Sequence, residues 1–447
     1  MSSVITGTLQ GTGQNTGLFE AMKIVFDEPI NNNIIQDSEV YDLVEQDTSI
    51  PIKETGAGRY VELAHYAADG GGFGARREGG ALPAATPPSI FNGRIFLRKN
   101  HMLVEMSGEA MRRVKSGEAA WITWASQALP NAVRRLTHHL DRQVLGYAQG
   151  VLARVATGGI TGANVTVDRA FGVTGYNKAV YQFLRNDLIR FAADINGVTM
   201  RTGSYRVLSV NNNTGVITLD AAPDVSVVAG DFITIGDSGD NNLPGSAILQ
   251  PKEMMGLLGM IDNGVIRATF QNVDRTLWPE YNAQVIDAAT ASTPAGQYNE
   301  DLLTLADDQT FEQGMGLVDA LIGSRAQERQ YVRALKTQRR LLDPQSYDND
   351  GGKGRGFTIN LNGRKVTFRP ARKCPDQINF GLEKKTLKKW RNGTGFSWDD
   401  TTGSMFERVV TSAGRFDAFY ATGQLEEEMG NLMPSHNFVI RNINVTA

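Results

Sequence analysis

The most constraining stretch of the sequence is residues 56–150, where two segments with a period of two enclose a glycine-rich run and lead into a long helical pattern. Residues 56–66 and 91–106 alternate in the manner of strands, which predicts the two arms of a hairpin. The intervening residues 69–82 have no period and many glycines. A tip of this kind cannot bury enough apolar surface to hold itself in place. The sequence therefore predicts that another surface, in the first place a second copy of the chain, holds the tip.

A helix is predicted from Ser116, a suitable N-cap, to Gly150, a suitable stop. Pro130 lies within the pattern and is expected to kink or divide the helix. One apolar stripe recurs at steps of three and four residues: Trp121, Trp124, Ala128, Val133, Leu136, Leu140, Val144 and Tyr147.

The opposite face of this helix is basic, with Arg134, Arg135 and Arg142. Contact with phosphates requires charge alone and no reading of sequence, so this face could contact DNA. Solvation or pairing between subunits is the favoured interpretation, and contact with DNA is the alternative.

The tip carries the pattern Arg-x-Glu-x-Gly-x-Leu-Pro at residues 76–83, between the arms of the hairpin and ahead of the long helix. This order of features resembles the major capsid protein of tailed double-stranded DNA bacteriophages, which has the Hong Kong 97 or Johnson fold. The resemblance implies an α+β chain with an N-terminal arm, an extended hairpin loop, a spine helix, and peripheral and axial domains. It also implies that the tip contacts the adjacent subunit, through Phe73, Arg76, Arg77, Glu78 and Leu82.

The remainder of the chain extends the resemblance. Short strands with Gly and Asp turns predict a small inserted β-barrel or sandwich, including a hairpin at 205–219. Asn299 is expected to cap one helix, Ser324 and Gln327 form a capping box for the next, and Asn362-Gly363 predicts a hairpin turn. The expected boundaries are 1–52 N-terminal arm, 53–106 hairpin loop, 107–157 spine helix and start of the peripheral domain, 158–250 inserted β-domain, 251–317 peripheral domain, 318–397 axial domain and 398–447 closing strands of the peripheral domain.

Two family features are expected to be absent. Many members begin with a charged, coiled segment that guides assembly and is then removed, and none is visible here, so a separate scaffolding protein or none is expected. Some members join neighbours through a lysine in the hairpin. The nearest lysines, Lys53 and Lys99, lie outside the tip, so non-covalent contacts are expected instead.

Composition narrows the class of protein further. The 447 residues can bury a sizeable core, and the net charge of −3 gives no basic footprint for sequence-specific nucleic-acid binding. Cys374 is the sole cysteine, so no intrachain disulfide can form, and a buried structural thiol is expected. No apolar run is long enough to span a membrane.

No motif supports an enzyme. His138 and His139 are adjacent and would point about 100° apart on a helix, which is a poor metal arrangement. The glycine-rich run 351–356 lacks the hydroxyl residue and the following helix of a phosphate loop. The sequence therefore predicts no catalytic residue, cofactor or metal.

We thus expect a head protein that assembles into hexamers and pentamers of an icosahedral shell around double-stranded DNA, formed in the bacterial cytoplasm and ending in the virion. Its expected partners are further copies of itself, a portal protein, a possible scaffolding protein, a possible decoration or cement protein and the packaged DNA, with no membrane. The alternatives are a β-rich carbohydrate-binding or hydrolytic protein and an encapsulin-type nanocompartment shell.

Overall fold

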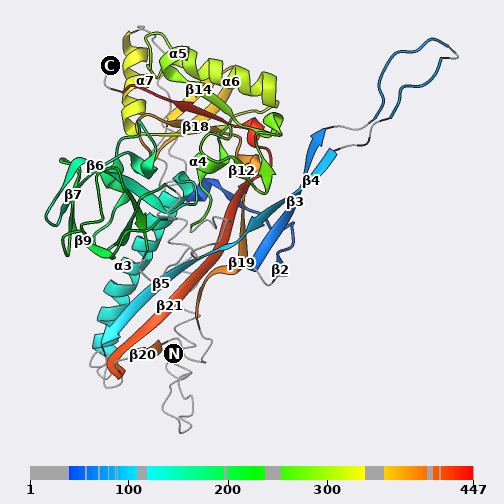
Figure 1. Ribbon diagram of the computed structural model, residues 1–447. Coiled ribbons are helices and arrows are strands. Elements are labelled where there is room, and N and C mark those ends of the chain that lie inside the picture. The colour runs from blue at the N-terminus through cyan, green and yellow to red at the C-terminus, as the bar shows by residue number, and fades with distance from the viewer. Residues whose placement is uncertain are drawn as a thin grey trace. The chain divides into compact units, whose positions relative to one another are not determined.

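The computed structural model describes residues 40–55, 58–68, 71–78, 80–85, 87, 89–107, 118–195, 199–236, 253–337, 357–399, 406–411 and 414–445 (Figure 1). The chain divides into two compact units. The first takes its described residues from 1–42, 97–141 and 390–427, and the second takes them from 43–96, 142–389 and 428–447. The expected arm at 1–39, the Ser116 cap and the run 351–356 lie outside the described residues.

Long antiparallel strands form the sheet of the first unit. β5 (Arg98–Ser107) pairs with β21 (Gly414–Asn431), which also pairs with β20 (Phe406–Thr411) and lies next to β19 (Leu387–Trp398). The start of β19 pairs in parallel with β1 (Glu45–Gln46). Phe396 and Trp398 are buried with their rings edge to face, 5.1 Å apart. A Cβ at Gly423 would lie 2.1 Å from the Phe396 ring, so this packing requires glycine in β21.

The long helix α3 spans Glu118–Leu145. Of the two expected effects of Pro130, a kink or a division, the division does not occur, because α3 is one helix through this residue, and it ends five residues before Gly150. The N–H of Gly146 still donates to the carbonyl oxygens of Arg142 and Gln143, after which Ala148 and Gly150 take positive φ angles of 74° and 72°. Among the described side chains the predicted stripe is buried, at Val133, Leu136, Leu140, Val144 and Tyr147.

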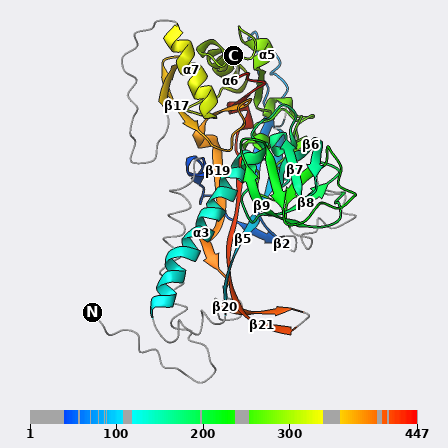
Figure 2. The same cartoon turned by 90° about the vertical axis from the view of Figure 1, so that its left-hand side faces the viewer.

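A closed six-stranded barrel follows α3, in the order β10-β7-β6-β11-β8-β9 (Figure 2). The strands are β6 (Val151–Thr161), β7 (Asn164–Asp168), β8 (Leu188–Ala192), β9 (Tyr205–Asn211), β10 (Val216–Leu219) and β11 (Phe232–Ile235). The predicted hairpin is present as β9 and β10. The expected start at residue 158 is wrong, because β6 begins at Val151 and its Leu152, Ala153 and Val155 are buried in the barrel core.

The second core lies around a mixed sheet in the order β14-β22-β18-β15-β17-β16. The strands are β14 (Gln284–Asp287), β15 (Ala320–Gly323), β16 (Phe357–Leu361), β17 (Arg364–Pro370), β18 (Asn379–Leu382) and β22 (Phe438–Arg441). β16 and β17 are the hairpin predicted at Asn362-Gly363, whose φ angles of 48° and 78° fit a tight turn. This sheet joins strands from 251–317, 318–397 and 398–447, so the expected boundaries at 317 and 397 do not separate independent cores.

Two capped helices pack on this sheet. α6 (Glu300–Gly314) begins after Asn299, whose side chain accepts from the N–H of Leu302 at 2.9 Å. α7 (Arg325–Thr337) begins with the predicted capping box, in which Ser324 N–H donates to Gln327 Oε1 and Gln327 N–H donates to Ser324 Oγ. Both predicted caps are confirmed. Shorter elements of this unit are α4 (Leu257–Met260), α5 (Ala288–Ala291), β12 (Thr269–Phe270) and β13 (Val273–Asp274).

Candidate assembly surfaces

The predicted hairpin is present as β3 (Gly58–Ala68) and β4 (Ser89–Phe96), with β2 (Lys53–Thr55) along the start of β3. Val61 pairs with Ile95 across the strands, and both are buried together with Leu63. The returning arm was expected to reach residue 106. It ends instead at Phe96, because β5 leaves β3 and pairs with β21. The arms therefore have a buried base that is shorter than the sequence pattern indicates.

Polar contacts fix this base. The Glu62 carboxylate accepts from Lys53 and, at 3.2 Å, from Arg94 Nε. Hydrogen bonding from Lys53, which is larger in effect than the opposing burial, lowers the pKa of Glu62. The Arg94 guanidinium also lies 5.5 Å from the centre of the Tyr60 ring, and the backbone N–H of Arg94 donates to the carbonyl oxygen of Gln271 at 3.1 Å. These contacts hold β4 against the β12–β13 turn.

The tip beyond these arms has no cover within the described chain. Phe73 and Leu82 are 104% and 87% exposed, and Arg76, Arg77 and Glu78 are exposed as well. A Cβ at Gly72 would lie 2.4 Å from the Ala84 carbonyl oxygen, so the two limbs of the tip approach each other closely. Figure 1 shows this loop extending beyond the ends of β3 and β4. The structure thus brings the five predicted contact residues together on one exposed loop.

The basic residues of α3 do not share one environment. Arg134 is exposed and Arg135 is half-buried. Arg142 is 1% exposed, and its two terminal nitrogens donate to the two carboxylate oxygens of Glu253, one of them at 2.9 Å. The prediction that Arg142 faces DNA is therefore wrong, because a guanidinium committed to a buried carboxylate cannot reach a phosphate. Local periodicity did not distinguish it, since its partner lies 111 residues away.

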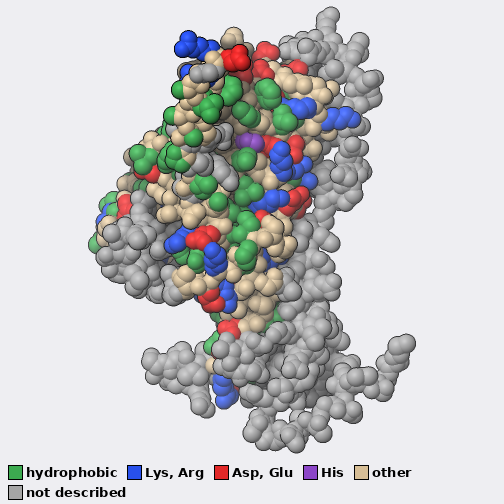
Figure 3. All heavy atoms as spheres, turned by 90° about the vertical axis from the view of Figure 1, so that its right-hand side faces the viewer, with side chains coloured by type: hydrophobic (Ala, Val, Ile, Leu, Met, Phe, Trp, Pro, Cys, Tyr) green, Lys and Arg blue, Asp and Glu red, His purple; other side chains and the backbone are tan. Residues whose placement is uncertain are grey.

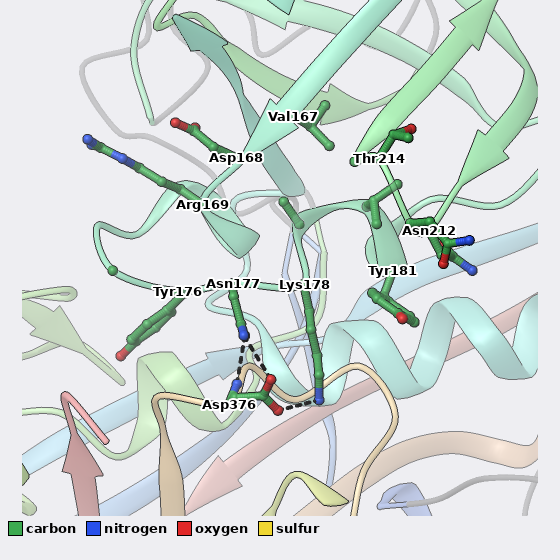
Figure 4. Close-up of a pocket in the computed structure, with 15 residues that line it drawn as sticks. Val167, Asp168, Arg169, Tyr176, Asn177, Lys178, Tyr181, Asn212, Thr214 and Asp376 are labelled. Carbon is green, nitrogen blue, oxygen red and sulfur yellow. Dashed lines mark hydrogen bonds and ion pairs between the residues drawn. The ribbon is translucent and has the colours of Figure 1, made fainter. Parts of the chain in front are cut away.

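A clamp that the sequence did not predict fastens the barrel to the loop between β17 and β18 (Figure 4). Asn177 Nδ2 donates to Asp376 Oδ2, and the Asp376 N–H donates back to Asn177 Oδ1, both at 2.8 Å. Lys178 Nζ lies 2.7 Å from Asp376 Oδ1 and also donates to the Cys374 carbonyl oxygen. Cys374 itself is fully buried, as expected. No local pattern marks this clamp, because its two sides lie about 200 residues apart.

A second buried polar group lies where the described chain begins. Tyr41 is fully buried, donates to Glu427 and accepts from Arg391. Burial, followed by the adjacent Glu427 carboxylate, raises the pKa of Tyr41 well above its usual value. These contacts hold Tyr41 against β19 and β21.

The described residues offer little else of chemical specificity. They contain no group of His, Cys, Asp and Glu that could hold a metal ion. None of their helices combines the length and apolar character needed to cross a membrane. On the face shown in Figure 3, acidic and basic side chains lie among one another rather than in separate fields.

No protein-family model and no curated protein match the chain. Among solved structures, it is similar to the cyanophage A-1(L) capsid asymmetric unit, with 12% identity, a TM-score of 0.43 and 91% of each chain covered. It is also similar to a chain of Mycobacterium phage Bobi, with 9% identity, a TM-score of 0.40 and 90% of each chain covered. A third similar chain is the SrpI encapsulin of Synechococcus elongatus, with 9% identity, a TM-score of 0.38 and 91% of this chain and 88% of that one covered.

These TM-scores lie below 0.5, so any functional conclusion depends on the chain's own residues. These solved chains come from two phages and from an encapsulin.

Proposed function

We propose that the protein is a major capsid protein whose copies form hexamers and pentamers of an icosahedral shell around double-stranded DNA. The observation that carries the proposal is the exposed tip of the β3–β4 hairpin. The base of this hairpin is fixed by Glu62 and Arg94, but its tip leaves Phe73 and Leu82 exposed to water. Exposed apolar side chains grouped in this way are typical of a surface that binds a partner. Packing against a neighbouring copy would bury these side chains.

Magnitudes favour apolar contact over charge at this tip. Burying Phe73 and Leu82 would stabilise the contact by about 1.5–3 kcal/mol for each side chain. The charged residues Arg76, Arg77 and Glu78 would add roughly 0–1 kcal/mol for each exposed ion pair that they form with the neighbour. Repeated over every copy in a shell, contacts of this size are sufficient to lock neighbours without a covalent bond.

The other parts of the chain receive complementary roles in this proposal. The β6–β11 barrel is the inserted domain, a candidate surface for decoration proteins. The six-stranded sheet with α6 and α7 belongs to the axial domain around the capsomer centre, and the long β5–β21 sheet with α3 belongs to the peripheral domain. Arg134 and Arg135 remain the residues proposed to face packaged DNA. A portal protein and a scaffolding protein are the further proposed partners, and no catalytic role is proposed.

Electron microscopy of the purified protein after size-exclusion chromatography tests this function. We expect rings, tubes or closed shells for the wild type, and free subunits for a Phe73→Asp, Leu82→Asp variant. Val225→Asp is the matched control, because Val225 is a 97% exposed apolar side chain on the barrel. It should assemble as the wild type does.

The two variants should also leave the subunit's unfolding midpoint unchanged, because fully exposed side chains contribute within about 0.5 kcal/mol to stability. A monomer that never assembles and whose residues 71–87 resist protease would refute the proposal. Resistance there would mean that the tip has a partner within its own chain.

A further inference from the structure

Two helices on the six-stranded sheet carry exposed faces of opposite charge. On α6 the exposed charges are the acidic residues Asp301, Asp308 and Glu312. Among the described side chains of α7 they are the basic residues Arg325, Arg329 and Arg333. The single carboxylate of described α7, Glu328, is half-buried. One chain therefore presents an acidic helix face and a basic helix face, called here the α6 face and the α7 face.

Helical spacing makes each face a continuous stripe. The three arginines of α7 recur at every fourth residue and span about 12 Å along the helix, and the α6 carboxylates, at steps of seven and four, span about 16 Å. The opposite sides of both helices are fixed by the core, in which Leu302, Leu303 and Tyr331 are buried. Neither stripe can therefore rotate inward, and the two have similar lengths.

Two of these charges, Glu312 and Arg325, are unfavourably placed within the isolated chain. Glu312 lies in the last turn of α6 and Arg325 is the first residue of α7, and each end of a helix disfavours that sign of charge. Like charges four residues apart repel along both stripes. Within the described residues no ion pair compensates Asp301, Glu312, Arg325 or Arg329. A complementary surface outside the chain would remove each of these costs.

We infer that the α6 face of one copy packs against the α7 face of the next copy around a ring, an inference that rests on the proposed shell function. Contact between two different faces of identical subunits is heterologous, and such contacts close into rings when the rotation permits. Phe311 and Met315, 57% and 81% exposed at the end of α6, and half-buried Val332 on α7 offer apolar surface beside the charges.

A second copy fits better than other occupants. DNA could pair with the α7 face alone, and would leave the acidic α6 face uncompensated. An accessory protein would need a separate partner surface for each stripe. A second copy satisfies both stripes at once, because every subunit in a ring offers one of each.

Charge reversal tests the pairing. Variant one carries Arg325→Glu and Arg329→Glu, variant two carries Asp301→Arg and Glu312→Arg, and a third variant carries all four changes. Assembly is followed at low salt by sedimentation velocity and electron microscopy. Each two-residue variant should need about tenfold or more protein to assemble, because like charges then oppose each other. The four-residue variant should return to the wild-type concentration, with the pairing inverted.

Mixing variants one and two gives a sharper readout. Subunits can then alternate, which permits rings with an even number of copies and forbids pentamers. We expect hexamers, with sheets or tubes in place of closed shells. Arg206→Glu and Glu280→Arg are matched controls, since both side chains are exposed and lie outside the two stripes.

The pairing is overturned if variants one and two assemble as the wild type does, or if the folded four-residue variant stays as weak as either of them. Should a reversal variant fail to fold, Arg325→Gln with Arg329→Gln replaces it, with a smaller loss of assembly expected. If the wild type itself forms no rings under any condition, the shell function fails. If it assembles without this reversal pattern, only the pairing fails.

Discussion

Replacing Arg142 separates two readings of the basic face of α3. Arg142 is 1% exposed, and its guanidinium makes a bidentate ion pair with Glu253, which is itself 8% exposed. Arg142→Ala would leave that carboxylate buried without its counter-charge. Removing one partner of a buried pair costs about 3–5 kcal/mol, far more than the loss of an exposed pair. We therefore expect Arg142→Ala to lower the free energy of unfolding by about 3–5 kcal/mol.

Arg134 provides the matched control, because it lies on the same helix and is exposed. Arg134→Ala should change the free energy of unfolding by less than about 0.5 kcal/mol. The measurement is urea denaturation of the disassembled subunit, followed by circular dichroism. A double replacement, Arg142→Met with Glu253→Leu, should recover most of the loss, because apolar side chains of similar size fill such sites at little cost.

The opposite result would refute this reasoning. If Arg142→Ala leaves the unfolding midpoint unchanged and instead lowers the amount of DNA retained in particles, the side chain faces the interior, which was the alternative interpretation of the sequence. A double replacement that is no more stable than Arg142→Ala would contradict the assignment of Glu253 as its partner.

Three further predictions follow from other contacts. Ser324→Ala should destabilise the subunit by about 1–2 kcal/mol through loss of the α7 cap, measured by urea denaturation against Ser324→Thr, which keeps the hydroxyl. Burial raises the pKa of Asp376, but hydrogen bonds from Lys178, Ser324 and Asn177 outweigh it and leave the pKa lowered. The ionised Asp376 carboxylate therefore stabilises the folded subunit fully above about pH 4, and this stabilisation is lost as the pH falls further. Asp376→Asn should lower the free energy of unfolding at pH 7 and should make that free energy depend less on pH on the acid side. If the free energy of unfolding of the variant depends on pH as it does in the wild type, the clamp is contradicted. Gly423→Ala should cost about 1–3 kcal/mol in melting experiments, because its Cβ would overlap the Phe396 ring, and Phe396→Leu should relieve part of that cost.

Local chemistry was sufficient to predict several elements. The caps at Asn299 and Ser324 depend on side chains that bond the backbone within three residues, so sequence spacing specifies them. The turn at Asn362-Gly363 requires positive φ at both residues, which this pair adopts readily. The tip at 69–82 was predicted for a related reason, because a glycine-rich segment without periodicity has nothing to bury, and its described residues are mostly exposed.

The boundaries of strands were harder to predict where one continuous alternating pattern contains two strands that pair with different strands. The alternation at 91–106 is continuous in sequence, yet β4 pairs with β3 and β5 pairs with β21. The start of the barrel at Val151 was missed for the same reason, because an apolar run after a helix does not show which core receives it.

The sequence by itself determined the helix caps at Asn299 and Ser324, the turn at Asn362-Gly363 and the loop that has no core of its own, because these depend on neighbours a few residues apart. Only the tertiary structure decided that Arg142 is buried, that Asp376 clamps the barrel and that β22 completes a sheet begun 150 residues earlier. The physical reason is that burial and ion pairing depend on residues more than 100 positions away in the chain, and the local periodicity of a sequence carries no information about such distant residues. The charged faces of α6 and α7 lie between these cases: the sequence contains their spacing, and the structure shows which side of each helix is left exposed.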